Sequence, residues 1–220
     1  MTPASFPLLY NYRRCPYAMR ARMALLVADV AFDVHEIVLR QKPAAMLALS
    51  PRGTVPVLAL PDGGVLEQSL DIVQWAFTAH GDPAGWWGRA QNAVNGELLS
   101  ACDGPFKHHL DRYKYPERFE GADRAQHREQ AVAVLLAPLD ARLQRAGQLG
   151  GDAPCATDIG IFPFVRQFAA VEPAWFAQLP LPALKAWWAG WLSHPLFESA
   201  MVKLPSDQVL RFPRSFPPTA

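Results

Sequence analysis

The sequence contains few cysteines and almost no excess charge. Its 220 residues include three cysteines, Cys15, Cys102 and Cys155, which lie far apart and match neither a disulfide framework nor a zinc-binding motif. The formal net charge is +1 at pH 7, which gives no reason to expect nucleic acid or an acidic membrane surface as a partner. Cysteines that are so few, odd in number and widely spaced suit a reducing compartment, and we expect a cytoplasmic location.

Long hydrophobic runs are also missing, although half of the residues are apolar. Asp29, Arg166 and several prolines interrupt the apolar stretches well before the about 18 residues that a membrane-spanning helix needs. The first six residues lack the basic start and apolar core of a secretion signal. We therefore expect a chain without a membrane span, long enough for two small domains with substantial cores.

Two kinds of hydrophobic pattern divide the chain. In residues 1–81, strand-like and helical segments alternate in the order βαβαββα, which predicts a mixed sheet flanked by helices. The expected strands cover 7–12, 32–39, 55–60 and 65–67, and the expected helices cover 16–28, 44–49 and 69–80. After a linker at 82–88 the strand signals stop, so 89–220 is expected to form an all-helical domain. The helical patterns there cover 89–111, 123–146, 158–171, 183–192 and 195–201, and a proline-rich tail from 205 is expected to run over the surface.

Cys15 begins a Cys-Pro-Tyr-Ala motif at the expected start of the first helix. Unpaired N–H groups and the helix dipole at such a position favour a thiolate, which would lower the cysteine pKa from about 8.5 toward roughly 3.5–7.5. Pro16 suits the first helical position, and Arg13, Arg14 and Arg20 add positive charge nearby. Cys15 is therefore a candidate nucleophile, with a buried, inert cysteine as the alternative.

Two dipeptides carry further signals. Proline is unusual within an apolar strand, so Val55-Pro56 suggests either a cis peptide bond that turns the backbone of Val55 toward a ligand or an edge strand. Gln68-Ser69 stands at a helix start, where a hydroxyl, an amide and free N–H groups can bind a carboxylate, although the serine could simply cap its own helix. Two acidic residues nearby could hold an amine, Glu67 and Asp71.

Taken together, these features resemble the glutathione transferase superfamily over roughly residues 7–205. In that family a helix-start nucleophile, a cis-proline after valine and a Glu/Gln-Ser pair occur in this order and at about these separations. The resemblance implies a thioredoxin-like domain at 1–81, followed by the family's all-helical domain at 89–220. It also implies glutathione as co-substrate, a small-molecule or disulfide second substrate and a homodimer.

The resemblance assigns glutathione contacts to five residues: Lys42, Val55, Pro56, Gln68 and Ser69. Cys15 would face the glutathione sulfur, and the Val55 backbone would pair with the cysteinyl backbone of glutathione. Gln68 and Ser69 would hold the γ-glutamyl end. Lys42 could reach the glycyl carboxylate, although a solvated surface lysine is the alternative.

The Cys-Pro-Tyr-Ala motif resembles that of glutaredoxin, with Ala18 in place of the second cysteine, and suggests an omega-like, cysteine-type bacterial member. Such a resemblance implies thioltransferase or dehydroascorbate reductase activity, through a Cys15–glutathione disulfide that a second glutathione resolves. Three alternatives remain open. Cys15 could only polarise glutathione for conjugation to an electrophile, the chain could be a non-catalytic interaction module, or Tyr10 or Tyr12 could replace Cys15 in a tyrosine-type mechanism.

The helical domain offers weaker signals. A stretch joining two expected helices is rich in aromatic and basic groups, and we interpret four of its residues as a candidate second-substrate pocket: Lys107, His108, Tyr113 and Lys114. A solvated connection is the alternative. His108 and His109 lack a third ligand in view, so we predict no metal site. Asp158 resembles the family's capping-box aspartate, with Cys155 in place of the hydroxyl residue, and is expected to serve folding.

Overall fold

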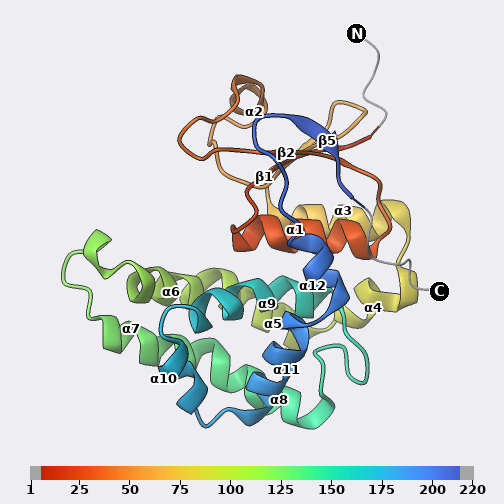
Figure 1. Cartoon of the computed structure of the whole chain (residues 1–220). Coiled ribbons are helices and arrows are strands. Elements are labelled where there is room, and N and C mark those ends of the chain that lie inside the picture. Colours follow the sequence, from red (N-terminus) through yellow and green to blue (C-terminus); the bar gives the residue numbers. More distant parts are fainter. Residues whose placement is uncertain (1–5, 214–220) are drawn as a thin grey trace. The chain divides into compact units, whose positions relative to one another are not determined.

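The computed structural model describes residues 6–213 (Figure 1). These residues form two compact units: Gly85–Leu192, and the described parts of Met1–Ala84 and Ser193–Ala220. The sequence predicts that 193–220 belongs to the helical domain, whereas the structure groups the described part of that segment with the first unit. The physical reason is a strand and a helix near the end of the chain, which pack on the sheet and on the first helix.

A five-stranded mixed sheet forms the first unit, in the order β4-β3-β1-β2-β5. Its strands are β1 (Leu8–Asn11), β2 (Asp33–Glu36), β3 (Val57–Ala59), β4 (Val65–Leu66) and β5 (Val209–Arg211). Its helices are α1 (Pro16–Val27), α2 (Ala44–Leu49), α3 (Ser69–His80) and α12 (Pro195–Ala200). Strand β1 is parallel to β2 and antiparallel to β3, so the predicted thioredoxin-like α/β arrangement is confirmed.

The centre of this sheet is apolar because β1 has buried neighbours on both sides. Leu9 is paired with Val34 of β2 and with Leu58 of β3, and all three side chains are fully buried. Helices α1 and α3 pack against each other on one face of the sheet (Figure 1). This packing brings the two helices into one layer, and Cys15 and Gln68-Ser69 lie at their N-termini.

Strand β5 corrects the expectation that no strand follows residue 81. It pairs antiparallel with β2, with Val34 opposite Leu210. Phe212, directly after β5, stacks on Phe32 with 4.8 Å between ring centroids. The proline-rich tail therefore does more than run over the surface, because its described part forms an edge of the sheet.

Helices make up the second unit, as predicted. They are α4 (Trp86–Ala90), α5 (Ala93–Ala101), α6 (Lys107–Lys114), α7 (Arg124–Ala131), α8 (Ala137–Ala146), α9 (Ala156–Ala169), α10 (Pro173–Gln178) and α11 (Pro182–Leu192). Single-turn segments lie at Pro83–Gly85 and Pro116–Arg118. The six-residue α10 was not predicted, because it is too short to show a periodic pattern.

Two π-helical segments lengthen helices of this unit. Cys102–Phe106 joins α5 to α6, and Val132–Leu136 joins α7 to α8. Pro105 lies inside the first segment, and Pro138 follows the second. A proline has no N–H for the regular ladder, and a widened turn is one way to accommodate it. The stretch that we expected to join two helices is therefore itself helical.

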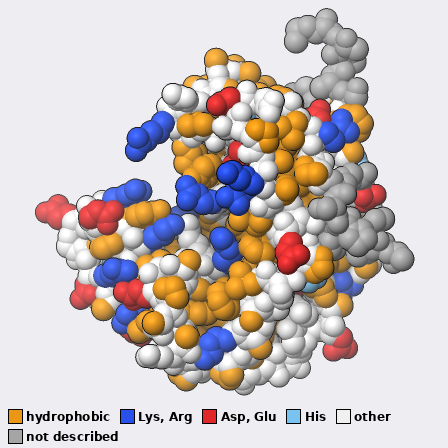
Figure 2. All heavy atoms as spheres, in the orientation of Figure 1, with side chains coloured by type: hydrophobic (Ala, Val, Ile, Leu, Met, Phe, Trp, Pro, Cys, Tyr) orange, Lys and Arg blue, Asp and Glu red, His pale blue; other side chains and the backbone are white. Residues whose placement is uncertain are grey.

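Among residues 6–213, no helix is long and apolar enough to cross a membrane. On the face drawn in Figure 2, hydrophobic and neutral surface separates many of the Lys and Arg side chains.

Candidate functional site

Cys15 immediately precedes α1 and occupies the N-cap position of this twelve-residue helix. Its backbone is extended, and its carbonyl oxygen accepts the hydrogen bond of the Met19 N–H at 2.9 Å. Pro16 takes the first helical position, and the first turn carries no acidic residue. The Cys15 side chain is partly exposed, whereas the other two cysteines are buried. The structure thus places one accessible thiol where the helix presents its positive end.

The peptide bond between Val55 and Pro56 is cis. Pro56 lies just before β3, a strand with neighbours on both sides, so the edge-strand alternative is wrong. The Cys15 thiol donates to the carbonyl oxygen of Val55, with 3.6 Å between Sγ and O. Residues 40 positions apart in the sequence are therefore brought together.

Ser69 is the first residue of α3, and Gln68 occupies the N-cap position without a side-chain capping bond. The serine is therefore not the cap of its own helix. Its side chain is buried, and its hydroxyl oxygen accepts a hydrogen bond from Arg20 Nη1 at 3.2 Å. Arg20 belongs to α1 and is fully buried, so a guanidinium lies beneath the start of α3. Its burial was not anticipated from sequence.

The remaining predicted glutathione contact, Lys42, is exposed and precedes α2. Its side chain lies beside Gly53, where an added Cβ would come within 3.2 Å of the lysine Nζ. Gly53 has a φ of +61°, a conformation that glycine adopts without strain. Lys42 thus lies against the turn that leads into Val55.

The two tyrosines before Cys15 differ in their surroundings. Tyr10 is 4% exposed and packs in the core with Ile37, Met46 and Val57. Burial raises its pKa above the ordinary value, which disfavours its phenolate. Tyr12 is partly exposed, and its phenolic oxygen accepts a hydrogen bond from Arg14 at 2.8 Å. Tyr10 is therefore a core residue, and Tyr12 packs against the same cluster while remaining partly exposed.

Three acidic residues belong to the segments around Cys15 and Ser69. Glu67 accepts a hydrogen bond from the Ser50 hydroxyl, and Asp71 lies exposed in the first turn of α3. Glu36 accepts from the backbone N–H of Arg13 at 2.7 Å. The last contact fixes the backbone two residues before Cys15, which helps to position the thiol.

In the second unit, the four predicted pocket residues do not share one environment. Lys107 forms an ion pair with Asp111 on its own helix, and His108 is exposed. Tyr113 is fully buried and donates to Glu172 Oε2 at 3.0 Å, and burial is the main cause that raises its pKa. The fourth, Lys114, lies over the ring of Tyr115.

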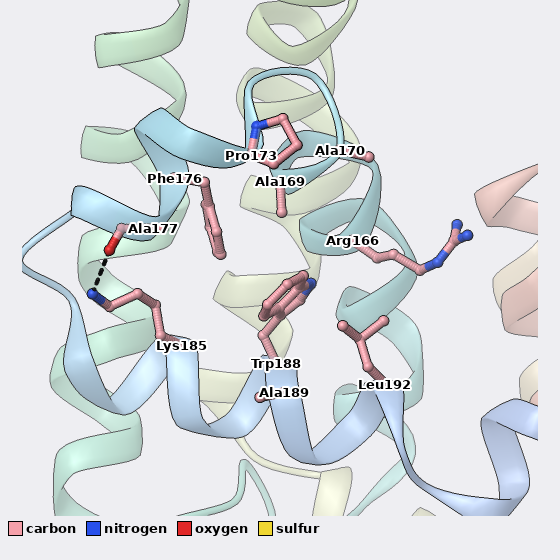
Figure 3. A pocket seen from close by; sticks show the side chains of 10 residues that line it. All are labelled: Arg166, Ala169, Ala170, Pro173, Phe176, Ala177, Lys185, Trp188, Ala189 and Leu192. Atoms are coloured by element: carbon pink, nitrogen blue, oxygen red, sulfur yellow. Dashed lines mark hydrogen bonds between the residues drawn. The ribbon is translucent and has the colours of Figure 1, made fainter.

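A cavity of about 520 Å³ lies instead among α9, α10 and α11 (Figure 3). Figure 3 shows the rings of Phe176 and Trp188 at its wall, and Lys185 at one side donating to the carbonyl oxygen of Ala177 at 3.0 Å. Its lining is largely apolar, with Arg166 as a second basic residue. The size and lining suit a small apolar or aromatic molecule. None of the predicted pocket residues lines it.

Asp158 lies fully buried in the first turn of α9. Its carboxylate accepts from the backbone N–H of Cys155 at 2.8 Å, the backbone N–H of Leu149 at 3.1 Å and Trp187 Nε1 at 2.7 Å. The Cys155 side chain completes a capping box, and its pKa is raised to about 12, chiefly by burial. These contacts connect a loop, the helix start and α11, so Asp158 has the folding role that we expected.

The sequence shows His108 and His109 without a third ligand in view. In the structure His127 of α7 lies beside both of them, so a third candidate ligand is present. Sequence alone did not reveal it because α6 and α7 are brought together only by packing.

Comparisons with known proteins agree with this geometry. Residues 9–84 match the family model "Glutathione S-transferase, N-terminal domain". A probable glutathione transferase of Aplysia californica is 37% identical over 71 residues, which cover 32% of this chain and 76% of the relative. Glutathione S-transferase omega-1 of Mus musculus is 24% identical over 203 residues, which cover 87% of this chain and 78% of the relative.

The fold of this chain is also similar to that of solved glutathione transferase structures. A glutathione transferase from Pseudomonas putida, with one glutathione disulfide bound per subunit, superposes with a TM-score of 0.75 at 19% identity. The superposition covers 90% of this chain and 93% of the other. Both the sequence relatives and the fold point to one family, and the chain belongs to the glutathione transferase superfamily.

Proposed function

We propose that this protein is a glutathione-dependent thiol transferase in which Cys15 is the nucleophile. The observation that carries the proposal is the partly exposed Cys15 thiol at the N-terminus of α1, with its Sγ 3.6 Å from the carbonyl oxygen of Val55. A helix N-terminus stabilises a thiolate, and a thiolate is the species that attacks a disulfide. Similarity to an omega-1 transferase over most of the chain supports the same choice.

The proposed reaction consists of two disulfide exchanges. The Cys15 thiolate attacks the glutathione sulfur of a mixed disulfide, forms a Cys15–glutathione disulfide and releases the other thiol, which takes up a proton. A second glutathione, as its thiolate, then attacks the glutathione sulfur on Cys15, and glutathione disulfide leaves with the Cys15 thiolate restored. Ala18 stands where glutaredoxin has a second cysteine, so the second thiol must come from glutathione.

Glutathione binding is proposed to use the neighbours of Cys15 in the first unit. The backbone of Val55, next to the cis bond, would pair with the cysteinyl backbone of glutathione. Gln68 and Ser69, at the start of α3, would hold the γ-glutamyl end, where the N–H groups of the helix favour a carboxylate. Arg20 adds a buried positive charge behind Ser69, and Lys42 would contact the glycyl carboxylate.

Cys15→Ser tests the nucleophile. We expect deglutathionylation of a small mixed disulfide to fall to background, because a serine hydroxyl cannot form a mixed disulfide. Glutathione affinity should be retained, since Val55, Gln68 and Ser69 are unchanged. Tyr12→Phe is the matched control and should keep its activity. Full thioltransferase activity in Cys15→Ser, or its loss in Tyr12→Phe, would contradict the proposal.

The same pair of variants separates the rival activities. If Cys15 only polarises glutathione, conjugation to an aromatic electrophile should exceed disulfide exchange in the wild type and survive Cys15→Ser, because serine can still donate a hydrogen bond to the thiolate. Reduction of dehydroascorbate by two glutathiones should depend on Cys15 as disulfide exchange does. An interaction module would fail to bind a glutathione column at all.

Assembly and location complete the proposal. We expect a homodimer, which light scattering of the purified protein would detect. None of the three described cysteines takes part in a disulfide, and the reaction consumes reduced glutathione, so a cytoplasmic location suits the chemistry. Fractionation of cells that express the protein would test the location.

A further inference from the structure

Three histidines meet on neighbouring helices of the second unit. His108 and His109 are consecutive residues of α6, and His127 lies on α7, which packs against α6. One ring nitrogen of each lies within 4.8 Å of the corresponding nitrogen of the other two. His108 is exposed, and the other two are partly buried, so the group opens to solvent on one side.

The contact between His109 and His127 shows how close the ring nitrogens are. Their Nδ1 atoms are 2.8 Å apart, which requires a proton on one nitrogen and a lone pair on the other. Two nitrogens that bind one tetrahedral zinc ion at about 2.0–2.1 Å lie roughly 3.3 Å apart. If the two Nδ1 atoms moved apart by about half an ångström, a metal ion could bind between them in place of the shared proton.

Arg112 opposes a cation at this place. Its Nη1 lies 3.0 Å from His108 Nδ1 and donates to the His108 carbonyl oxygen at 3.3 Å. Its guanidinium also packs over the ring of Phe119, at 4.3 Å from the centroid, which gives it a second stable contact. Removing this charge should strengthen metal binding, a result that a merely structural histidine cluster would not produce.

We propose that His108, His109 and His127 form a binding site for one divalent transition metal ion of the zinc or nickel class. Imidazole nitrogens suit these ions, and three protein ligands leave a fourth position for water. Both Nδ1 atoms can bind the ion when the two rings carry their protons on Nε2. The site lies in Gly85–Leu192, whereas Cys15, Val55 and Ser69 belong to the other unit, so the proposal does not depend on the proposed activity.

Calorimetric titration of the untagged protein with zinc chloride, and separately with nickel chloride, tests the site in the absence of glutathione. We expect one ion per chain in the wild type. His127→Gln and His108→Gln should each weaken binding by at least about tenfold, since even partners of metal ligands contribute about 10–100-fold. Arg112→Gln should tighten it.

Two controls make the result specific. His80→Gln changes an exposed histidine on α3 and should leave the affinity unchanged. Cys15→Ser should also bind as the wild type does, which excludes the accessible thiol as the ligand. His108 is exposed, so its variant is expected to fold, and melting curves would verify this. The proposal is overturned if the wild type binds neither ion, if both histidine variants bind like the wild type, or if Cys15→Ser abolishes binding.

Discussion

Replacing Ser69 by alanine should weaken glutathione binding. A purely structural role of Ser69 in α3 would not have this effect. Ser69 is 5% exposed, and its hydroxyl oxygen accepts from the fully buried Arg20 at 3.2 Å, which leaves the hydroxyl proton available for an incoming carboxylate. A hydrogen bond to a charged group contributes about 1.5–3 kcal/mol, which corresponds to roughly 10–100-fold in the dissociation constant of glutathione.

The same change should also affect stability, because Arg20 loses one buried acceptor. For a chain of this length, about 1.5–3 kcal/mol corresponds to a fall in melting temperature of roughly 3–12 °C. Calorimetric titration with glutathione and a melting curve would measure the two effects on one sample. Thr78→Ala is the matched control, since Thr78 lies exposed on the same helix. A lower melting temperature with unchanged glutathione affinity would refute a role of Ser69 in binding.

Three further predictions concern buried and titratable groups. Asp158→Asn keeps an oxygen that can accept two of the three hydrogen bonds, but it places an amide NH₂ group opposite the Cys155 N–H. The free energy of unfolding, measured in urea, should therefore fall by about 1–3 kcal/mol. An unchanged free energy of unfolding would contradict the folding role of Asp158. The pKa of Glu172 is held below its ordinary value, first by Arg128, so its contribution to stability is lost as pH falls through that lowered pKa. Glu172→Gln should therefore flatten the stability profile at acidic pH, below the ordinary glutamate pKa of 4.5. Iodoacetamide should alkylate Cys15 in the folded protein and spare Cys155, as mass spectrometry of the digested protein would show.

Local chemistry explains why much of the first unit could be predicted. The expected helix at 69–80 coincides with α3, and Gly81 has the positive φ that suits a residue directly after a helix. Pro16 identifies the start of α1 in the same way. Each of these signals depends on a few adjacent residues, so sequence alone contains the information.

Features that depend on distant partners could not be predicted. Val209–Arg211 has only three residues and becomes a strand because β2, far away in the sequence, provides its ladder. Arg20 lies in an ordinary helical pattern, and its complete burial runs against the usual tendency of arginine. His127 lies 18 residues after His109, and only the packing of α6 on α7 makes them neighbours. In each case tertiary structure, rather than local preference, determines the outcome.

The return of the chain to its first unit has a consequence for biosynthesis. Because β5 and α12 are made after the whole helical unit, the sheet that begins at Leu8 is completed only when Arg211 has been translated. Until then β2 has an open edge, and an unpaired edge strand readily pairs with other chains. Strand β2 is thus translated long before the strand with which it pairs. A fragment that ends at residue 84 would keep that edge permanently exposed, so aggregation of such a fragment would reflect the missing strand rather than an inability of the remaining sequence to fold.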